Sequence, residues 1–162
     1  RLRRISGPAG GYAGIGNSCC LRAVCDFLDG LDADGLMPKT ILYTLNPSDN
    51  AMLATLTGSF SESGVQKLQF GPAWWYNDHE CGIRDNLDAL GSYSLMSMSL
   101  GMTTDSRTIL SFSRHDYFRR ILCDYIGNRV ERGELPADME FLGGVVTGIS
   151  YRNADKWIYG NE

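Results

Sequence analysis

The sequence predicts an α/β fold made of three βα units with parallel strands, followed by a further C-terminal helix. Segments with the apolar spacing of helices alternate along the chain with short segments rich in β-branched and aromatic residues. Hydrophobic residues make up 43% of the 162 residues and charged residues 21%, which is the balance of an ordinary globular domain. Strands that alternate with helices are expected to be parallel and joined by right-handed crossovers.

The first third of the chain predicts a loop, a helix and a strand. Residues 7–18 (GPAGGYAGIGNS) are too rich in glycine for a regular element and predict a loop. Residues 19–31 place their apolar side chains at helical spacing, which predicts the first helix. Residues 39–50 (KTILYTLNPSDN) predict a short buried strand, and a helix is expected over about residues 49–58.

The middle of the chain predicts two more strands around a helix. Residues 68–78 (LQFGPAWWYND) predict a strand that runs into a loop, and residues 81–94 have the apolar spacing of a helix. Residues 95–107 (LMSMSLGMTTDSR) alternate large apolar with small polar side chains, which predicts the third strand. In that strand Asp105 and Arg107 would share the small, polar face.

Two helices are expected after the third strand. Ser113 is predicted to cap the first, with Asp116 completing a capping box, and the segment RGELP is predicted to end it. The last helix is predicted to begin at about Ala137 and to bury an apolar stripe. The members of that stripe are Phe141, Leu142, Val145, Val146 and Ile149.

Three strands alone would form an incomplete sheet. Helices would cover its outer face, whereas the small, polar inner face would need further strands to pack against. A complete eight-stranded (β/α)8 TIM barrel takes about 250 residues. We therefore expect residues 1–162 to form a single partial domain, the last three-eighths of such a barrel, and the start RLRRISG, without an initiator Met, indicates that an upstream segment is missing.

Composition excludes several functional classes. A formal charge of −4 without a block of Lys and Arg argues against a nucleic-acid surface. The sequence has neither an apolar run of about 18 residues nor the apolar core of a signal peptide, which predicts a cytoplasmic protein that does not enter a membrane. The five cysteines include no CxxC pair, so we expect reduced packing residues rather than disulfides or a cysteine zinc site.

The candidate site residues follow the predicted strands, because active sites of such barrels lie at the C-terminal ends of the strands. Asp105 at a strand end can ligate a divalent metal or accept a proton, and Arg107 can bind a carboxylate. The alternative is an Asp-Arg pair that only caps the next helix. Trp74 and Trp75 are suited to packing on a sugar ring, although the pattern alone favours core packing.

Other chemistry-bearing residues favour structural roles. His79 and His115 lack HxH or HExxH spacing, so hydrogen-bonded or solvent-exposed structural histidines are expected. The glycine-rich loop contains neither GxGxxG nor GKS/T, which argues against phosphate binding. The arginines of the helix after the third strand favour a solvated face or ion pairs; they are Arg114, Arg119 and Arg120.

Four segments in this order resemble the C-terminal part of uronate isomerase (glucuronate isomerase), a family of metal-binding barrels in the amidohydrolase superfamily. They are PKTILYTLNPSDN, LQFGPAWWYND, GMTTDSRTILSFSRHDYFRRIL and GELPADMEFLGGVV. The resemblance runs from about Gly7 to the end and covers the last third of a family member. It implies the reversible isomerisation of D-glucuronate to D-fructuronate and of D-galacturonate to D-tagaturonate. The proton would move between C2 and C1 through an enediol.

The resemblance also implies roles for individual residues. Asp105 would ligate the metal, usually zinc, and Arg107 would contact the hexuronate substrate and stabilise the intermediate. The tryptophan pair would line the substrate site, with Trp75 favoured over Trp74. The family's HxH metal ligands belong to a strand that this sequence does not contain, so these 162 residues alone are expected to be inactive. The complete enzyme is expected to be a homo-oligomer. The alternative function is that of a non-catalytic binding or assembly module derived from the same barrel.

Overall fold

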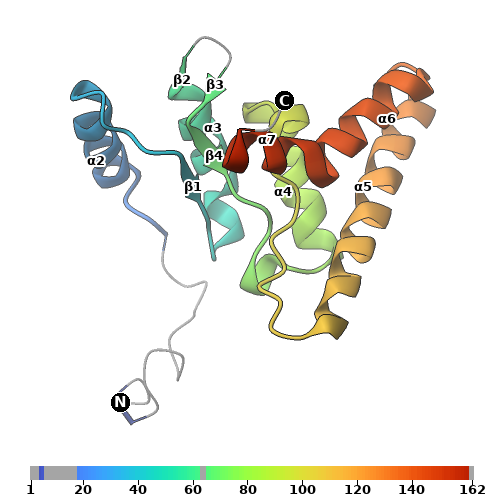
Figure 1. Cartoon of the computed structure of the whole chain (residues 1–162), viewed down its shortest axis with the longest axis horizontal. Coiled ribbons are helices and arrows are strands. Elements are labelled where there is room, and N and C mark those ends of the chain that lie inside the picture. Colours follow the sequence, from blue (N-terminus) through green and yellow to red (C-terminus); the bar gives the residue numbers. More distant parts are fainter. Residues whose placement is uncertain (1–3, 6–17, 63–64, 161–162) are drawn as a thin grey trace.

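The computed structural model describes residues 4–5, 18–62 and 65–160, which form a mostly helical α/β fold (Figure 1). The main helices are α2 (Leu21–Ala33), α3 (Asn50–Ser59), α4 (Glu80–Tyr93), α5 (Ser113–Glu131), α6 (Met139–Thr147) and α7 (Asn153–Tyr159). The strands are β1 (Thr40–Leu42), β2 (Ser61–Glu62), β3 (Val65–Gln66) and β4 (Leu68–Phe70). Short 3-10 turns are η1 (Pro47–Asp49), η2 (Trp75–Asn77), η3 (Met96–Met98) and η4 (Ile109–Phe112), and η5 (Gly148–Arg152) is a π-helical turn.

The predicted parallel pairing of the first two strands is confirmed. β1 and β4 pair in parallel, with Thr40 opposite Leu68 and Leu42 opposite Phe70. The connection between them contains α3, as the alternation of patterns predicted. It also contains a short antiparallel pair, β2 with β3, which the sequence analysis did not predict.

The predicted third strand over residues 95–107 is wrong, and a sheet of three parallel strands is not formed by the described residues. Residues 96–98 form η3, and residues 99–107 have no regular secondary structure. Side-chain amides donate hydrogen bonds to the backbone carbonyls that would otherwise accept from a neighbouring strand. Gln69 Nε2 donates to the Met98 carbonyl at 3.4 Å, and Asn153 Nδ2 donates to the carbonyls of Ser97 (2.7 Å) and Ser99 (2.8 Å).

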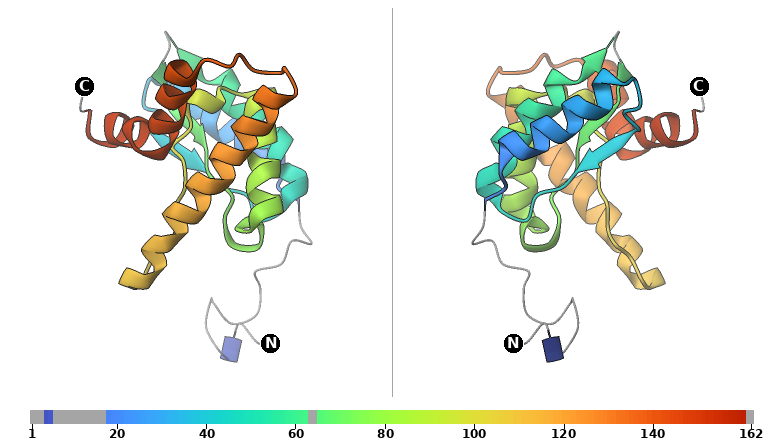
Figure 2. Two further views of the ribbon diagram at one scale, coloured as in Figure 1. Left: turned by 90° about the vertical axis from the view of Figure 1, so that its right-hand side faces the viewer. Right: turned by 90° about the vertical axis from the view of Figure 1, so that its left-hand side faces the viewer.

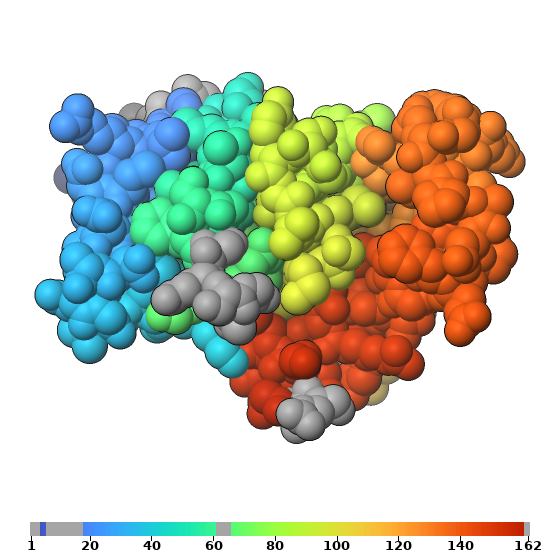
Figure 3. Space-filling view, turned by 90° about the horizontal axis from the view of Figure 1, so that it is seen from above, coloured from blue at the N-terminus to red at the C-terminus, as the bar shows by residue number. Residues whose placement is uncertain are grey.

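The core consists of two apolar clusters that meet at one side chain. One lies among α4, α5 and the C-terminal helices and includes Phe118, Leu122 and Ile149. The other lies among α2, α3 and β4. Met96 packs against both clusters, so η3 lies where they meet. Seen from above, α2, α3, α4 and α5 follow one another across the molecule from blue to orange, and the C-terminal segment in red lies along one side of them (Figure 3).

The start of α5 differs from the predicted capping box. η4 runs directly into α5, so Ser113 already has helical backbone angles and cannot act as the cap. Its hydroxyl donates to the Leu110 carbonyl at 2.9 Å, and Asp116 instead forms ion pairs with Arg119 and Arg120. The ion pairs predicted for these two arginines are therefore confirmed.

The predicted last helix is divided into α6, the π-helical turn η5 and α7. Asp138 caps α6, because its carboxylate accepts from the amides of Glu140 and Phe141. Leu142 and Ile149 are buried as predicted, but Phe141 is 59% exposed. The predicted burial of Phe141 is therefore wrong for this chain.

The helix α7 lies against the starts of the two parallel strands. The indole Nε1 of Trp157 donates to the Gln66 carbonyl at 2.7 Å, and the Lys39 ammonium donates to the Trp157 carbonyl. Lys39 directly precedes β1, and Gln66 lies two residues before β4. α7 therefore occupies the end of the strands opposite to the loops that follow them (Figure 1).

Two expectations from composition can be compared with the structure. All five cysteines are free, as predicted, but the packing role is wrong because Cys25 alone is partly buried and the other four are exposed. Over the described ranges, no helix combines the length and the apolar character needed to cross a membrane. The predicted glycine-rich loop over residues 7–18 lies almost entirely outside the described residues.

Candidate active site

Three segments meet where β1 and β4 end: the residues after β1, the residues after β4, and the segment that leads to Asp105. The Tyr43 hydroxyl, one residue beyond β1, lies 3.0 Å from the Thr103 hydroxyl and hydrogen-bonds to it. Asn77 Nδ2, in the turn that follows β4, donates to the Thr44 carbonyl at 3.3 Å. These contacts join residues far apart in sequence at the lower end of the molecule in Figure 1.

The tryptophan pair forms part of a row of aromatic side chains at this end. Trp74 is half-buried, and its ring centroid lies 5.5 Å from that of Tyr43 and 5.4 Å from that of Trp75. Trp75 is 45% exposed and therefore offers a free aromatic surface. Trp74, the more buried of the two, packs against Trp75. One indole therefore has a packing role and the other is accessible to a ligand.

The backbone of Trp75 lies in an unfavourable region. Its φ is +54°, in the left-handed region that bulky side chains rarely adopt. The turn is held by the Asn77 amide, which donates to the Trp74 carbonyl at 3.1 Å, and by the His79 amide, which donates to the Asn77 carbonyl at 2.9 Å. Such strained residues persist where neighbouring contacts hold them, and they gather at functional sites.

Asp105 and Arg107 lie close together, with Arg107 Nη2 at 3.7 Å from Asp105 Oδ2. Their side chains are 55% and 85% exposed, so the ion pair is worth at most about 1 kcal/mol and leaves both groups available to a ligand. Asp105 also has a positive φ, +46°. The geometry contradicts the reading of this pair as a helix cap, because η4 and α5 have no side-chain cap hydrogen bond.

Arg114 connects two of the three segments, and the sequence analysis missed this role. Its Nη1 donates to the carbonyl of Thr104 at 2.7 Å, and its Nη2 forms an ion pair with Asp78. The Asp78 side chain is only 8% exposed. The one signal in the sequence was the carboxylate of the aromatic segment WWYND. If that carboxylate is buried, a cation is expected nearby, because a buried charge is costly unless it is paired.

Two other polar residues near this end have structural roles. His79 caps α4, since its Nδ1 accepts from the Gly82 amide at 3.2 Å, as the structural interpretation predicted. Asp49 is buried, and its two oxygens accept from the Ser18 hydroxyl and the Cys19 amide. Partial desolvation, together with the negative charge of Asp49, raises the pKa of the Cys19 thiol above its ordinary value.

The metal-binding capacity of this site rests on one carboxylate. Across residues 4–5, 18–62 and 65–160, no group of three or more His, Cys, Asp or Glu side chains is placed to hold a metal ion. A catalytic zinc takes about three protein ligands. The exposed oxygens of Asp105 suit one position of such a set, so the described residues do not form a complete zinc site by themselves.

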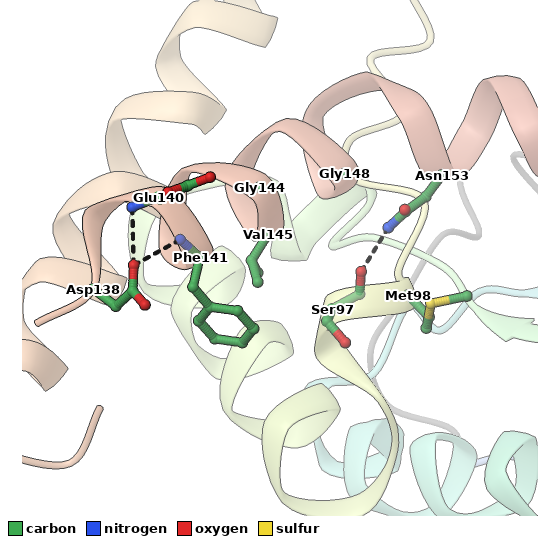
Figure 4. A pocket seen from close by; sticks show the side chains of 9 residues that line it. All are labelled: Ser97, Met98, Asp138, Glu140, Phe141, Gly144, Val145, Gly148 and Asn153. Carbon is green, nitrogen blue, oxygen red and sulfur yellow. Dashed lines mark hydrogen bonds between the residues drawn. The ribbon is translucent and has the colours of Figure 1, made fainter. Parts of the chain in front are cut away.

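A hollow elsewhere on the molecule contains none of the candidate residues. It has a volume of about 540 Å³ and opens between η3 and α6. Figure 4 shows Phe141 and Val145 of α6 on one side of it, with Ser97 and Met98 opposite and Asn153 directed at Ser97. Two carboxylates line it, Asp138 and Glu140, but Asp138 accepts from backbone amides as the cap of α6, so we place the candidate site at the opposite end, beside Asp105.

Comparisons with known proteins agree on one family. The family model for glucuronate isomerase matches residues 1–158. The chain is 47% identical over 159 residues to a uronate isomerase of Caldanaerobacter subterraneus subsp. tengcongensis, covering 98% of this chain and 34% of that protein. It is 51% identical over 154 residues to a uronate isomerase of Halalkalibacterium halodurans, covering 94% of this chain and 33% of that protein.

A solved structure shows the same likeness in three dimensions. The crystal structure of a uronate isomerase from Thermotoga maritima superposes with a TM-score of 0.81 at 29% sequence identity. The match covers 96% of this chain and 33% of the crystallised one. The chain therefore spans about a third of the length of the relatives it matches.

Proposed function

The chain belongs to the glucuronate isomerase family, and on that premise we propose that it forms the C-terminal third of a uronate isomerase. The reaction would interconvert D-glucuronate with D-fructuronate and D-galacturonate with D-tagaturonate. The observation that carries the proposal is the position of Tyr43 at the end of one of two parallel strands, where it hydrogen-bonds to Thr103, next to the TDSR segment, and packs on Trp74, within a family match over residues 1–158.

We further propose that β1, β4 and residues 99–107 are three neighbouring parts of an amidohydrolase-type (β/α)8 barrel. Two features support the barrel. β1 and β4 are parallel and are joined through a helix, as in every βα unit of such a barrel. The exposed indole of Trp75 lies in the loop after β4, and the segment with Asp105 and Arg107 reaches the same end through the contact of Thr103 with Tyr43, whereas the opposite end is covered by α7. Active sites of these barrels lie at the C-terminal end of the strands.

The exposed groups match the chemistry of a hexuronate. The Arg107 guanidinium is a planar fork that can bind the sugar carboxylate through two parallel hydrogen bonds. The exposed indole of Trp75 offers an apolar surface on which the C–H face of a sugar can pack. Arg107 would thus fix one end of the substrate while Trp75 supports its ring or chain.

The isomerisation moves two protons and one electron pair within the substrate, since one hydrogen passes from C2 to C1 and one from O2 to O1. Removal of the C2 proton lets the C2–H electron pair form a C1=C2 double bond, and the aldehyde oxygen takes up a proton to give an enediol. Protonation of C1 and loss of the O2 proton then yield the ketose. Asp105 is the exposed carboxylate at the site that can hold or accept a proton, and Arg107 stabilises negative charge that develops on the substrate.

A divalent metal, zinc by resemblance to the family, would supply a Lewis acid when bound. We propose Asp105 as one ligand, with the other ligands on residues outside this chain. The complete enzyme is proposed to be a cytoplasmic homo-oligomer. The five free cysteines suit a reducing compartment, and the exposed apolar residues of η4 are compatible with further packing.

The test uses the complete reading frame that contains these 162 residues. The purified protein should convert both hexuronates to their ketoses, followed by proton NMR, and should exchange a substrate C–H proton with D₂O. Failure to isomerise either hexuronate would contradict the proposal and favour a non-catalytic binding or assembly module.

Asp105→Asn in the complete protein should lower kcat by at least about 100-fold and reduce the metal content measured by mass spectrometry. The amide keeps the shape of the carboxylate but loses its charge. Asp85→Asn, on the exposed surface of α4, is the matched control and should change neither quantity. Full metal occupancy in Asp105→Asn would remove Asp105 from the ligand set.

A further inference from the structure

We propose that Arg114 is a positioning residue that holds the Asp105 segment and the tryptophan turn in a fixed relation to each other. Its catalytic consequence rests on the proposed isomerase function, whereas the positioning itself is a property of the fold that can be measured separately. The residue lies in the first turn of α5, at the end of that helix that projects from the body of the molecule (Figure 2).

One guanidinium group contacts both segments. Nη1 donates to the carbonyl of Thr104, the residue directly before Asp105, at 2.7 Å. Nη2 pairs with the carboxylate of Asp78, three residues after Trp75. Because the two nitrogens belong to one rigid, planar group, the spacing of Thr104 and Asp78 is fixed by the geometry of the fork.

The two acceptors of these contacts are largely shielded from water, and the Arg114 side chain that donates to them is 39% exposed. The Asp78 side chain is 8% exposed, and Thr104 is 7% exposed. Among the residues that the structure describes, Arg114 is the cation paired with Asp78. Hydrogen bonds from a charged donor are stronger than neutral ones, and a buried carboxylate strongly favours a paired cation.

The two segments need such an anchor, because each contains a strained residue. Trp75 and Asp105 are the non-glycine residues with positive φ in the described part of the chain. Conformations of this kind persist only when surrounding contacts determine them. Arg114 pairs with Asp78, which is three residues after Trp75, and donates to the carbonyl of the residue directly before Asp105.

The anchor is rigid because the next turns of α5 are held in the core. Phe118 is 5% exposed, Ile121 5% and Leu122 0%. The other arginines in the first turns of α5 differ from Arg114, since Arg119 and Arg120 pair only with the exposed Asp116. Of these three arginines, Arg114 is therefore the one that connects the packed helix α5 to the candidate site.

The experiment compares variants of the complete protein by steady-state kinetics and by hydrogen exchange. Arg114→Gln should lower kcat about 10- to 100-fold, with a smaller change in KM, because the loops lose their relative position by a distance on the order of 1 Å. Arg114→Lys keeps the charge but not the fork, so its kcat should lie between those of the wild type and Arg114→Gln. Arg120→Gln, which removes one exposed ion pair from the same helix, is the control and should match the wild type.

A second variant controls for misfolding of Arg114→Gln. Arg114→Gln leaves Asp78 buried without its cation, whereas the double variant Arg114→Gln with Asp78→Asn removes both charges. The double variant should fold cooperatively and still show the lowered kcat, because the Thr104 carbonyl has lost its donor. A kcat restored to that of the wild type in the double variant would overturn the positioning role.

Hydrogen exchange separates this inference from the proposed function. The amides of Asn77, Asp78 and His79 are hydrogen-bonded within the tryptophan turn, so peptides covering residues 74–79 should exchange faster in Arg114→Gln than in Arg120→Gln. If exchange is faster in Arg114→Gln but the wild-type protein shows no isomerase activity, the positioning role stands and only the proposed function is refuted. Equal exchange in the two variants would refute the positioning of the turn by Arg114.

Discussion

Gly82→Ala is expected to damage the candidate site while leaving most of the fold in place. Gly82 is buried near the start of α4, directly beneath the tryptophan turn. A Cβ there would lie 2.1 Å from the carbonyl oxygen of Asn77 and 2.8 Å from its Cα and carbonyl carbon. Because these atoms belong to the backbone, no side chain can rotate away, and the turn has to move by about 1 Å to reach ordinary contact.

The effects on stability and on activity should differ in size. Overpacking of this kind costs about 1–3 kcal/mol, and alanine regains up to about 1 kcal/mol of helix propensity over glycine. The net loss in the free energy of unfolding should therefore be about 0–3 kcal/mol. A shift of the turn would weaken the contact of Asn77 with the Thr44 carbonyl, already 3.3 Å long, and move Trp75 relative to Asp105. Displacement of a positioned group by about 1 Å can cost about 100-fold in kcat.

The matched control is Gly91→Ala in the same helix. Gly91 is exposed, and its added Cβ would meet only the Tyr125 hydroxyl, at an ordinary contact distance of 3.8 Å. This variant should gain about 0.5–1 kcal/mol in stability with kcat unchanged. The assays are urea denaturation, tryptophan emission and steady-state kinetics of the complete protein. If Gly82→Ala gained the same stability as Gly91→Ala and kept the same kcat, the reasoning would be refuted.

Two further predictions concern stability. Burial and a hydrogen bond to Asp88 raise the pKa of the Tyr125 phenol above its ordinary value of 10.0. The contribution of Tyr125 to stability is therefore complete below pH 10 and is lost as the pH rises through the raised pKa. Tyr125→Phe should show a shallower fall in the free energy of unfolding above pH 10. Equal slopes for the two proteins in urea denaturation at several pH values would contradict this. Gly101 has a φ of +74°, and a Cβ there would lie 2.2 Å from the Ile149 carbonyl oxygen. Gly101→Ala should therefore lower the free energy of unfolding by roughly 2–4 kcal/mol, and an unchanged Tm would refute the close approach.

Most helices and the first two strands could be predicted from the sequence, because their signals are local. The apolar spacing of residues 19–31 and 81–94 predicted α2 and α4 to within two residues at each end. The β-branched run around Ile41 predicted β1, and the alternation with helices predicted its parallel pairing with β4. The helices satisfy their own backbone hydrogen bonds, and β1 and β4 satisfy theirs by pairing with each other.

The third strand failed because its outcome depends on partners far away in the sequence. Alternation of apolar and small side chains over residues 95–107 is compatible with a strand, but a strand also needs a neighbour to accept its ladder bonds. Here the side chains of Gln69 and Asn153 bond the carbonyls of residues 97–99 instead. No local pattern contains that information.

The sequence by itself determined the family resemblance, the helical elements and the identity of the exposed acid, base and indole, since these depend on residue type and spacing within short segments. The tertiary structure alone decided that Arg114 joins Thr104 to Asp78 and that Trp75 is exposed while Trp74 packs on Tyr43. The physical reason is that a buried charge selects its partner by proximity in space, and proximity between residues 78, 104 and 114 exists only after α4 and α5 have packed together.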